Sequence, residues 1–100
     1  MVLESAWLHA LERNWTSAGE DARKAAHLDP TSPEPLILAG IVCREEAKWS
    51  EAHDFFGRAL RLAPENPTAL LGRGRAGLAL GKHEEAFQDL TRTLAVDPGH

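Results

Sequence analysis

The sequence predicts an all-α fold, a solenoid of three antiparallel helix pairs, and three observations carry this prediction. Pro30, Pro64 and Pro98 are equally spaced along the chain. The same step separates the alanines at positions 18, 52 and 86. Within each unit of this length, apolar side chains recur at spacings of three and four, which is the period of one helix face. A fixed period of this kind is typical of repeat arrays, in which each unit stacks on its neighbours.

The second unit shows the helix pair most clearly. An apolar stripe that includes Leu36 and Cys43 predicts one helix, and a stripe that includes Phe56 and Leu60 predicts the next. Shifting both helices by the period in each direction predicts the other four. The expected helices cover residues 2–12, 16–28, 33–46, 50–62, 67–80 and 84–96.

Prolines and capping residues punctuate these helices. Ser32 precedes Pro33 and Asn66 precedes Pro67, so each predicts an N-cap followed by proline at the first helical position. Pro64 follows the fourth helix and stops it. Because one pair is too small to bury its own apolar face, the pairs are expected to stack into a single domain over 1–100, with repeats of about 1–32, 33–66 and 67–100.

Composition excludes several classes of function. The chain has 100 residues, 43% of them hydrophobic, so it suits one globular domain. Its net charge of −4 argues against nucleic-acid binding. The single cysteine excludes an internal disulfide. No apolar run approaches the roughly 20 residues of a membrane span, and the start lacks a basic signal region. We therefore expect a cytoplasmic protein without direct membrane insertion.

Several columns of the period carry a family resemblance. In the second unit they are Leu36, Gly40, Cys43, Trp49, Ala52, Phe56, Ala59 and Pro64. In the third they are Leu70, Gly74, His83, Ala86, Leu90 and Pro98. The first unit looks like a shorter-sided copy with Ala6, Trp15, Ala18, Ala25 and Pro30. Together they resemble the tetratricopeptide repeat, and the resemblance implies a right-handed superhelix.

Two residues of the third unit depart from that family pattern. Arg73 stands where the family usually has a buried leucine, and Gly77 where it usually has an aromatic residue. With Gly72 and Gly74, Gly77 gives the fifth helix three glycines, each of which costs about 1 kcal/mol relative to alanine. We expect this helix to be the loosest.

The resemblance also implies a binding surface. In this family the first helix of each unit lines a concave groove that holds the ligand. The groove positions by phase are Leu3, Trp7, Ile37, Leu38, Ile41, Arg44, Leu71, Arg75 and Leu78. An exposed apolar patch of this extent marks an interaction site. Self-association through the patch and packing within the chain are the alternatives.

Some family members hold an acidic C-terminal peptide with lysine and asparagine along the groove. The matching positions here are Leu3, Trp7, Leu38 and Gly72. Because none of these side chains supplies the charge or amide of that clamp, we do not expect binding of chaperone-type acidic tails.

Other motifs have simpler explanations. The stretch Gly72–Gly77 spells the dinucleotide fingerprint Gly-x-Gly-x-x-Gly, but it is predicted to lie within a helix without a preceding strand. The five histidines lack the spacing of metal ligands. Cys43 is expected to be a buried, inert thiol. No local set of residues supports nucleophilic catalysis, so no metal, cofactor or enzymatic activity is predicted.

The function predicted from sequence is therefore a non-catalytic module that binds a protein or peptide in an apolar concave groove. The alternatives are a self-associating scaffold, which includes a homo-oligomer, and a regulatory domain of a larger protein.

Overall fold

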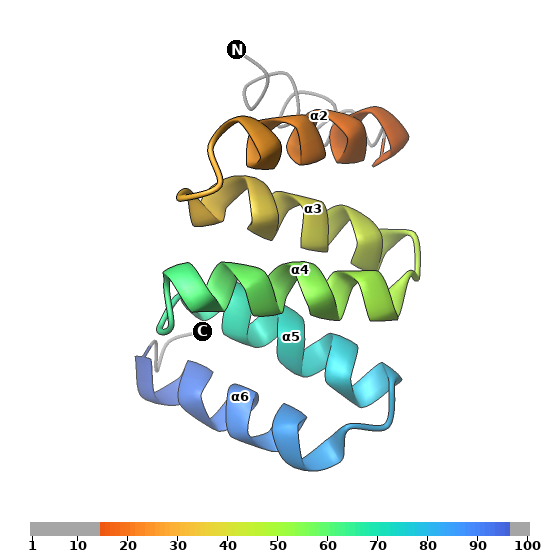
Figure 1. Ribbon diagram of the computed structural model, residues 1–100. Coiled ribbons are helices and arrows are strands. Elements are labelled where there is room, and N and C mark those ends of the chain that lie inside the picture. Colours follow the sequence, from red (N-terminus) through yellow and green to blue (C-terminus); the bar gives the residue numbers. More distant parts are fainter. Residues whose placement is uncertain (1–14, 97–100) are drawn as a thin grey trace.

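The computed structural model of the protein describes residues 15–96, and this part of the chain is entirely helices and turns (Figure 1). Its helices are α2 (Trp15–Leu28), α3 (Pro33–Glu45), α4 (Trp49–Leu62), α5 (Pro67–Ala79) and α6 (His83–Val96). The all-α prediction is confirmed, and each helix lies within one residue of its predicted ends. The helix predicted over 2–12 lies outside the described residues. None of the described helices has the length and apolar character that a membrane crossing requires.

The turns inside the second and third helix pairs have the same backbone form. Ala47 has a φ of 59°, and Gly81, its equivalent in the next repeat, has a φ of 81°. In each turn the next amide reaches back into the preceding helix: the N–H of Lys48 donates to the carbonyl of Cys43 and that of Lys82 to the carbonyl of Gly77, both at 2.8 Å. This hydrogen bond, with a left-handed residue before it, ends the helix in the Schellman manner.

Both predicted N-cap residues stand directly before a helix that begins with proline, Ser32 before α3 and Asn66 before α5. The Asn66 side chain accepts a hydrogen bond from the N–H of Ala69 at 3.1 Å. The Ser32 side chain makes no such hydrogen bond, and Pro35, at the third position of α3, has no N–H to donate to it.

Consecutive helices pack against one another along the stack. In addition α3 contacts α5, whereas α2 and α4, and α4 and α6, do not approach each other in this way. The stack is therefore closer on the side of α3 and α5, which we call the inner face, and opens on the side of α2, α4 and α6, the outer face. Figure 1 shows the antiparallel sequence of helices along this stack.

Glycines allow the closest approaches in the core. Phe56 on α4 is completely buried. A Cβ atom on Gly40 would lie 2.8 Å from its ring, and one on Gly72 would lie 2.4 Å from it. Gly74 makes room in the same way for Leu90, which a Cβ atom would approach to 2.9 Å. Gly40 and Gly74 thus leave the space that the neighbouring helix fills, while the relative looseness of α5 stays a prediction.

Candidate functional site

The predicted groove residues of α3 and α5 occupy equivalent places. Ile37, Ile41 and Arg44 follow one another at spacings of four and three along α3, and so do their equivalents on α5, one repeat later. This spacing places each set along one side of its helix. We call the six residues the inner stripe, which consists of Ile37, Ile41, Arg44, Leu71, Arg75 and Leu78.

Two predicted surface residues are buried, and for these two the prediction of an exposed groove position was wrong. Leu38 has no exposed surface, because it packs with Ala18 and Ala22 of α2 and Val42 of its own helix. Ile37 is 7% exposed and belongs to the main core cluster. Leu3 and Trp7, the predicted groove residues of the first unit, lie outside the described residues.

The rest of the inner stripe becomes more accessible toward the end of each helix. Ile41 and Leu71 are half-buried, and Ile41 also packs against the main core cluster. Arg75 is exposed, and Leu78 exposes 48% of its surface. Arg44 is half-buried and donates a weak hydrogen bond to Glu45 at 3.4 Å. The accessible part of the stripe is thus an apolar edge with two guanidinium groups beside it.

Cys43 is buried, as predicted. Its sulfur lies 3.7 Å from a guanidinium nitrogen of Arg23 and 3.8 Å from a carboxylate oxygen of Glu51. Burial raises the pKa of this thiol, and the contact with Arg23 only partly opposes that effect. The thiol therefore stays protonated at neutral pH, which is the state of an unreactive cysteine.

The other motifs gain no chemical role from the fold. The glycine-rich stretch lies inside α5, where its backbone amides belong to the helix rather than to a phosphate-binding loop. Over residues 15–96 no three histidine, cysteine or acidic side chains gather in a way that would hold a metal ion.

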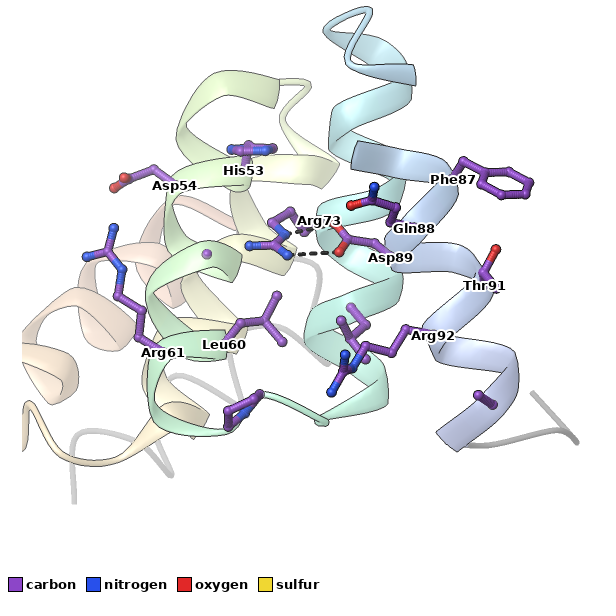
Figure 2. A pocket seen from close by; sticks show the side chains of 14 residues that line it. His53, Asp54, Leu60, Arg61, Arg73, Phe87, Gln88, Asp89, Thr91 and Arg92 are labelled. Atoms are coloured by element: carbon purple, nitrogen blue, oxygen red, sulfur yellow. Dashed lines mark hydrogen bonds and ion pairs between the residues drawn. The ribbon is translucent and has the colours of Figure 1, made fainter. Parts of the chain in front are cut away.

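A hollow that sequence reasoning did not predict lies on the outer face. It has a volume of about 810 Å³ and lies between α4 and α6, with Leu70 and Arg73 of α5 beneath it (Figure 2). Leu60 and Pro64 line its apolar end, and the Arg73–Asp89 ion pair lies on its floor.

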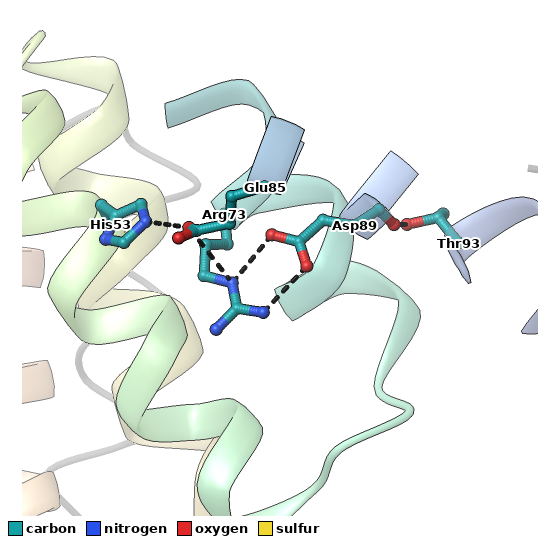
Figure 3. A network of polar contacts seen from close by, with 5 residues as sticks. All are labelled: His53, Arg73, Glu85, Asp89 and Thr93. Carbon is teal, nitrogen blue, oxygen red and sulfur yellow. Dashed lines mark hydrogen bonds and ion pairs between the residues drawn. The ribbon is translucent and has the colours of Figure 1, made fainter. Parts of the chain in front are cut away.

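A polar network joins the second and third units at this floor (Figure 3). The Arg73 guanidinium donates two hydrogen bonds to Asp89, each 2.8 Å long. Asp89 is only 4% exposed, so this pair supplies the partner that its buried carboxylate needs. Glu85 lies 3.9 Å from Arg73 and hydrogen-bonds to His53 of α4. Thr93 donates its hydroxyl proton to the backbone carbonyl of Asp89 at 2.8 Å. A bidentate pair of this kind fixes the relative position of α5 and α6.

These contacts shift two pKa values. The hydrogen bond from His53 lowers the pKa of Glu85, assisted by the positive charge of Arg73. The hydrogen bonds to Asp89 raise the pKa of Arg73. Both shifts favour the charged forms of Arg73 and Glu85. The signal that could have revealed it is the joint departure of Arg73 and Asp89 from the apolar residues Ala39 and Phe55, which stand one repeat earlier.

Comparisons with known proteins agree with this architecture. The family model described as "Tetratricopeptide repeat" matches residues 40–100. The heat-shock protein cognate co-chaperone sgt12 of Aspergillus fumigatus is 33% identical over 88 residues, covering 82% of the chain. The chain spans only 26% of that protein's length, and 11% of the Arabidopsis thaliana repeat-containing thioredoxin TTL4.

Two solved structures are similar in fold. The Arabidopsis OM64 TPR domain gives a TM-score of 0.95 at 20% identity, over 99% of this chain and 82% of that one. The first TPR domain of Spaghetti (RPAP3), bound to the HSP90 peptide SRMEEVD, gives a TM-score of 0.95 at 24% identity, over 99% of this chain and 79% of that one.

Proposed function

Because the chain belongs to the tetratricopeptide repeat family, we propose that it is a non-catalytic module that binds a protein or peptide partner along the inner face of α3 and α5. The observation that carries this proposal is the accessible part of the inner stripe. Leu78 exposes 48% of its surface next to the exposed Arg75, and the half-buried Leu71 continues the apolar surface along α5. An apolar patch bordered by arginine is the composition that protein interfaces favour.

The proposed mechanism is burial of apolar side chains of the partner against this stripe. Ile41 packs against the core beneath it, so it offers a rigid surface that loses little freedom when a partner binds, and the half-buried Leu71 takes the equivalent side of α5. Arg44 and Arg75 border the same surface and would orient carboxylates or backbone carbonyls of the partner. Leu3 and Trp7 extend the proposed surface into the part of the chain outside the described residues.

The HSP90 peptide bound by the RPAP3 domain is a poor candidate for the partner. Leu38 is completely buried, and Gly72 is covered by the Phe56 ring. Neither position therefore presents a hydrogen-bond donor to an acidic peptide on the inner face. We expect isothermal titration calorimetry with SRMEEVD to give no measurable heat of binding. Binding at one site would contradict an apolar mode of recognition.

A matched pair of variants tests the proposed surface. Leu78→Asp places a charge on the inner stripe, whereas Leu94→Asp places one on α6, where Leu94 is 58% exposed. Affinity capture with the wild type and both variants should recover partners that only Leu78→Asp loses. If Leu78→Asp retains every partner, or if Leu94→Asp loses the same ones, the inner stripe is not the binding surface. Circular dichroism of all three proteins verifies that helicity is unchanged.

A second candidate function is self-association through α6. Phe87 and Leu94 are 71% and 58% exposed, whereas Leu60, the equivalent of Leu94 in the preceding repeat, is 7% exposed because α5 covers it. Light scattering over a concentration range decides between the candidates. Association that Leu94→Asp abolishes favours the scaffold. A protein that stays monomeric at high concentration contradicts self-association.

A further inference from the structure

We propose that the hollow between α4 and α6 binds an aromatic side chain, next to a carboxylate, on a segment of a partner protein. This second site lies on the outer face (Figure 2), and its lining includes no residue of the inner stripe. It does not depend on binding along the inner stripe, because the two surfaces share no residue, whereas Phe87 of the second candidate function lines this hollow.

The contact between the first and second units supplies the template for this site. Between α2 and α4, the ring of Phe55 packs against both core clusters. Two guanidinium groups lie over the ring: that of Arg23 on α2 at 5.8 Å from its centroid and that of Arg58 on α4 at 5.4 Å. Both distances are within the range of a cation–π interaction. The space between these two outer helices is therefore occupied by a ring held by arginines.

Two of these three positions carry different residues one repeat later. Asp89 is the equivalent of Phe55, Gly57 that of Arg23, and Arg92 that of Arg58. The ring and one guanidinium are therefore missing between α4 and α6, while the other guanidinium is kept. Asp89 does not replace the ring, because its carboxylate turns to Arg73 on the floor.

The wall at Gly57 is open as well. A Cβ atom added there would meet only the Arg73 side chain, at 4.0 Å. The hollow that results has about 810 Å³, against about 620 Å³ for the one that Phe55 borders between α2 and α4.

The lining suits a ring better than an aliphatic chain or a free ion. Leu60, Pro64 and Leu70 form the apolar end of the hollow, and the charges of Arg73 and Asp89 on the floor neutralise each other. Arg92 at the rim is 54% exposed and pairs with the exposed Glu65 at 3.3 Å. Such exposed pairs are weak, so Arg92 is able to stack on an incoming ring as Arg58 stacks on Phe55.

The charges at the rim of the hollow favour a particular residue beside the aromatic residue of the partner. Arg61 and Arg92 line the hollow and are exposed, and Asp54 is the exposed acid that lines it. A carboxylate beside the aromatic residue complements these arginines. The exposed lining also indicates a protein segment rather than a small metabolite, because small-molecule sites enclose most of their ligand.

Three short peptides test the site on the full 100-residue chain. The probe is acetyl-Asp-Phe-amide, and the controls are acetyl-Asp-Leu-amide and acetyl-Lys-Phe-amide. In two-dimensional NMR titrations the probe should shift the backbone amides of Gly57, Asp89 and Arg92, and both controls should bind more weakly. Equal binding by the leucine peptide or by the lysine peptide, shifts centred on the inner stripe, or no shifts up to the solubility limit would overturn the proposal.

Variants at the wall and the rim locate the binding. Gly57→Leu fills the hollow and should abolish binding, while Gly57→Ala is the matched control that leaves it intact. Arg92→Gln removes the cation and should weaken binding about two- to fivefold, the size of an exposed cation–π contact. Leu78→Asp on the inner stripe should have no effect. Probe binding retained in Gly57→Leu, or lost in Leu78→Asp, places the site elsewhere. Thermal unfolding of each variant shows that it remains folded.

Discussion

At the two boundaries between units, the large side chain that fills the interface comes from different helices. At the first boundary, between α2 and α3, the small Ala22 faces the large Leu38. At the second, between α4 and α5, the large Phe56 faces Gly72. The positions are equivalent, because Phe56 and Gly72 follow Ala22 and Leu38 by one repeat. The volume has moved from one helix to its neighbour, which is the kind of exchange that close-packed interiors tolerate.

The outer halves of these boundaries differ in polarity. Ala39 of α3 and Phe55 of α4 belong to apolar packing beside the first boundary, whereas the equivalent Arg73 and Asp89 form an ion pair between α5 and α6, beside the second boundary. The repeat backbone thus accepts a large chemical change when both partners change together. The hollow between α4 and α6 has about 810 Å³, against about 620 Å³ for the one that Phe55 borders between α2 and α4.

Among the substitutions that test this comparison, removal of the Phe56 ring is expected to reduce stability most. Phe56→Ala leaves a cavity between two glycine-bearing helices that have little side-chain material with which to fill it. We expect a loss of about 3–5 kcal/mol in the free energy of unfolding, measured by chemical denaturation. The matched control is Phe87→Ala, whose side chain is 71% exposed and whose loss should cost within about 0.5 kcal/mol. Equal effects of the two substitutions would contradict the packing argument.

The size exchange itself gives a sharper version of this test. Gly72→Leu alone should be strongly destabilising, because a Cβ atom there lies 2.4 Å from the ring. Combined with Phe56→Ala, it recreates the arrangement of Ala22 and Leu38 at the first boundary. The double variant should therefore be more stable than either single variant.

The ion pair between α5 and α6 gives the next largest effect. Asp89→Ala leaves the Arg73 guanidinium partly buried with Glu85 at 3.9 Å as its nearest remaining acid. The free energy of unfolding should fall by at most about 3 kcal/mol, because Arg73 keeps this weaker partner. Denaturant titrations of the variant and the wild type at neutral pH measure the loss.

The equivalent residues one repeat earlier suggest a double variant that should restore the stability lost in Asp89→Ala. Arg73→Ala combined with Asp89→Phe converts the pair to the residues found one repeat earlier, Ala39 and Phe55. This double variant should recover most of the stability lost in Asp89→Ala, because no charge remains buried and a ring fills the hollow. Failure to recover would mean that the two boundaries differ in backbone geometry as well as in side chains.

The sequence was sufficient for the helices because their determinants are local. The apolar stripes and the proline stops predicted a helix over 33–46 and one over 84–96, and the structure has Pro33–Glu45 and His83–Val96. Exposure was harder to predict because it depends on the neighbouring unit. Leu38 was expected on the surface, yet it is buried because Ala22 leaves space for it on α2.

The polar network escaped prediction for a related reason. Each helix pattern indicates which residues share a face, but not which charge of α6 meets which charge of α5. Arg73 was recognised as a departure from the family pattern, whereas its partner Asp89 was found only in the structure. Ion pairing between helices depends on the tertiary structure. The repeat period places Arg73 and Asp89 on their helices, but it does not show that the two side chains meet.

The turns inside the second and third units give the smallest expected effect and isolate the backbone from the packing. Ala47 adopts the left-handed conformation that the equivalent Gly81 adopts without steric cost. Ala47→Gly should therefore raise the free energy of unfolding by about 1 kcal/mol, and Gly81→Ala should lower it by about the same amount. Thermal melts should show shifts of about 5 °C in opposite directions. Since Ala47 and Gly81 are both exposed, packing contributes little to either change. Shifts of the same sign would show that the two turns do not share one backbone form.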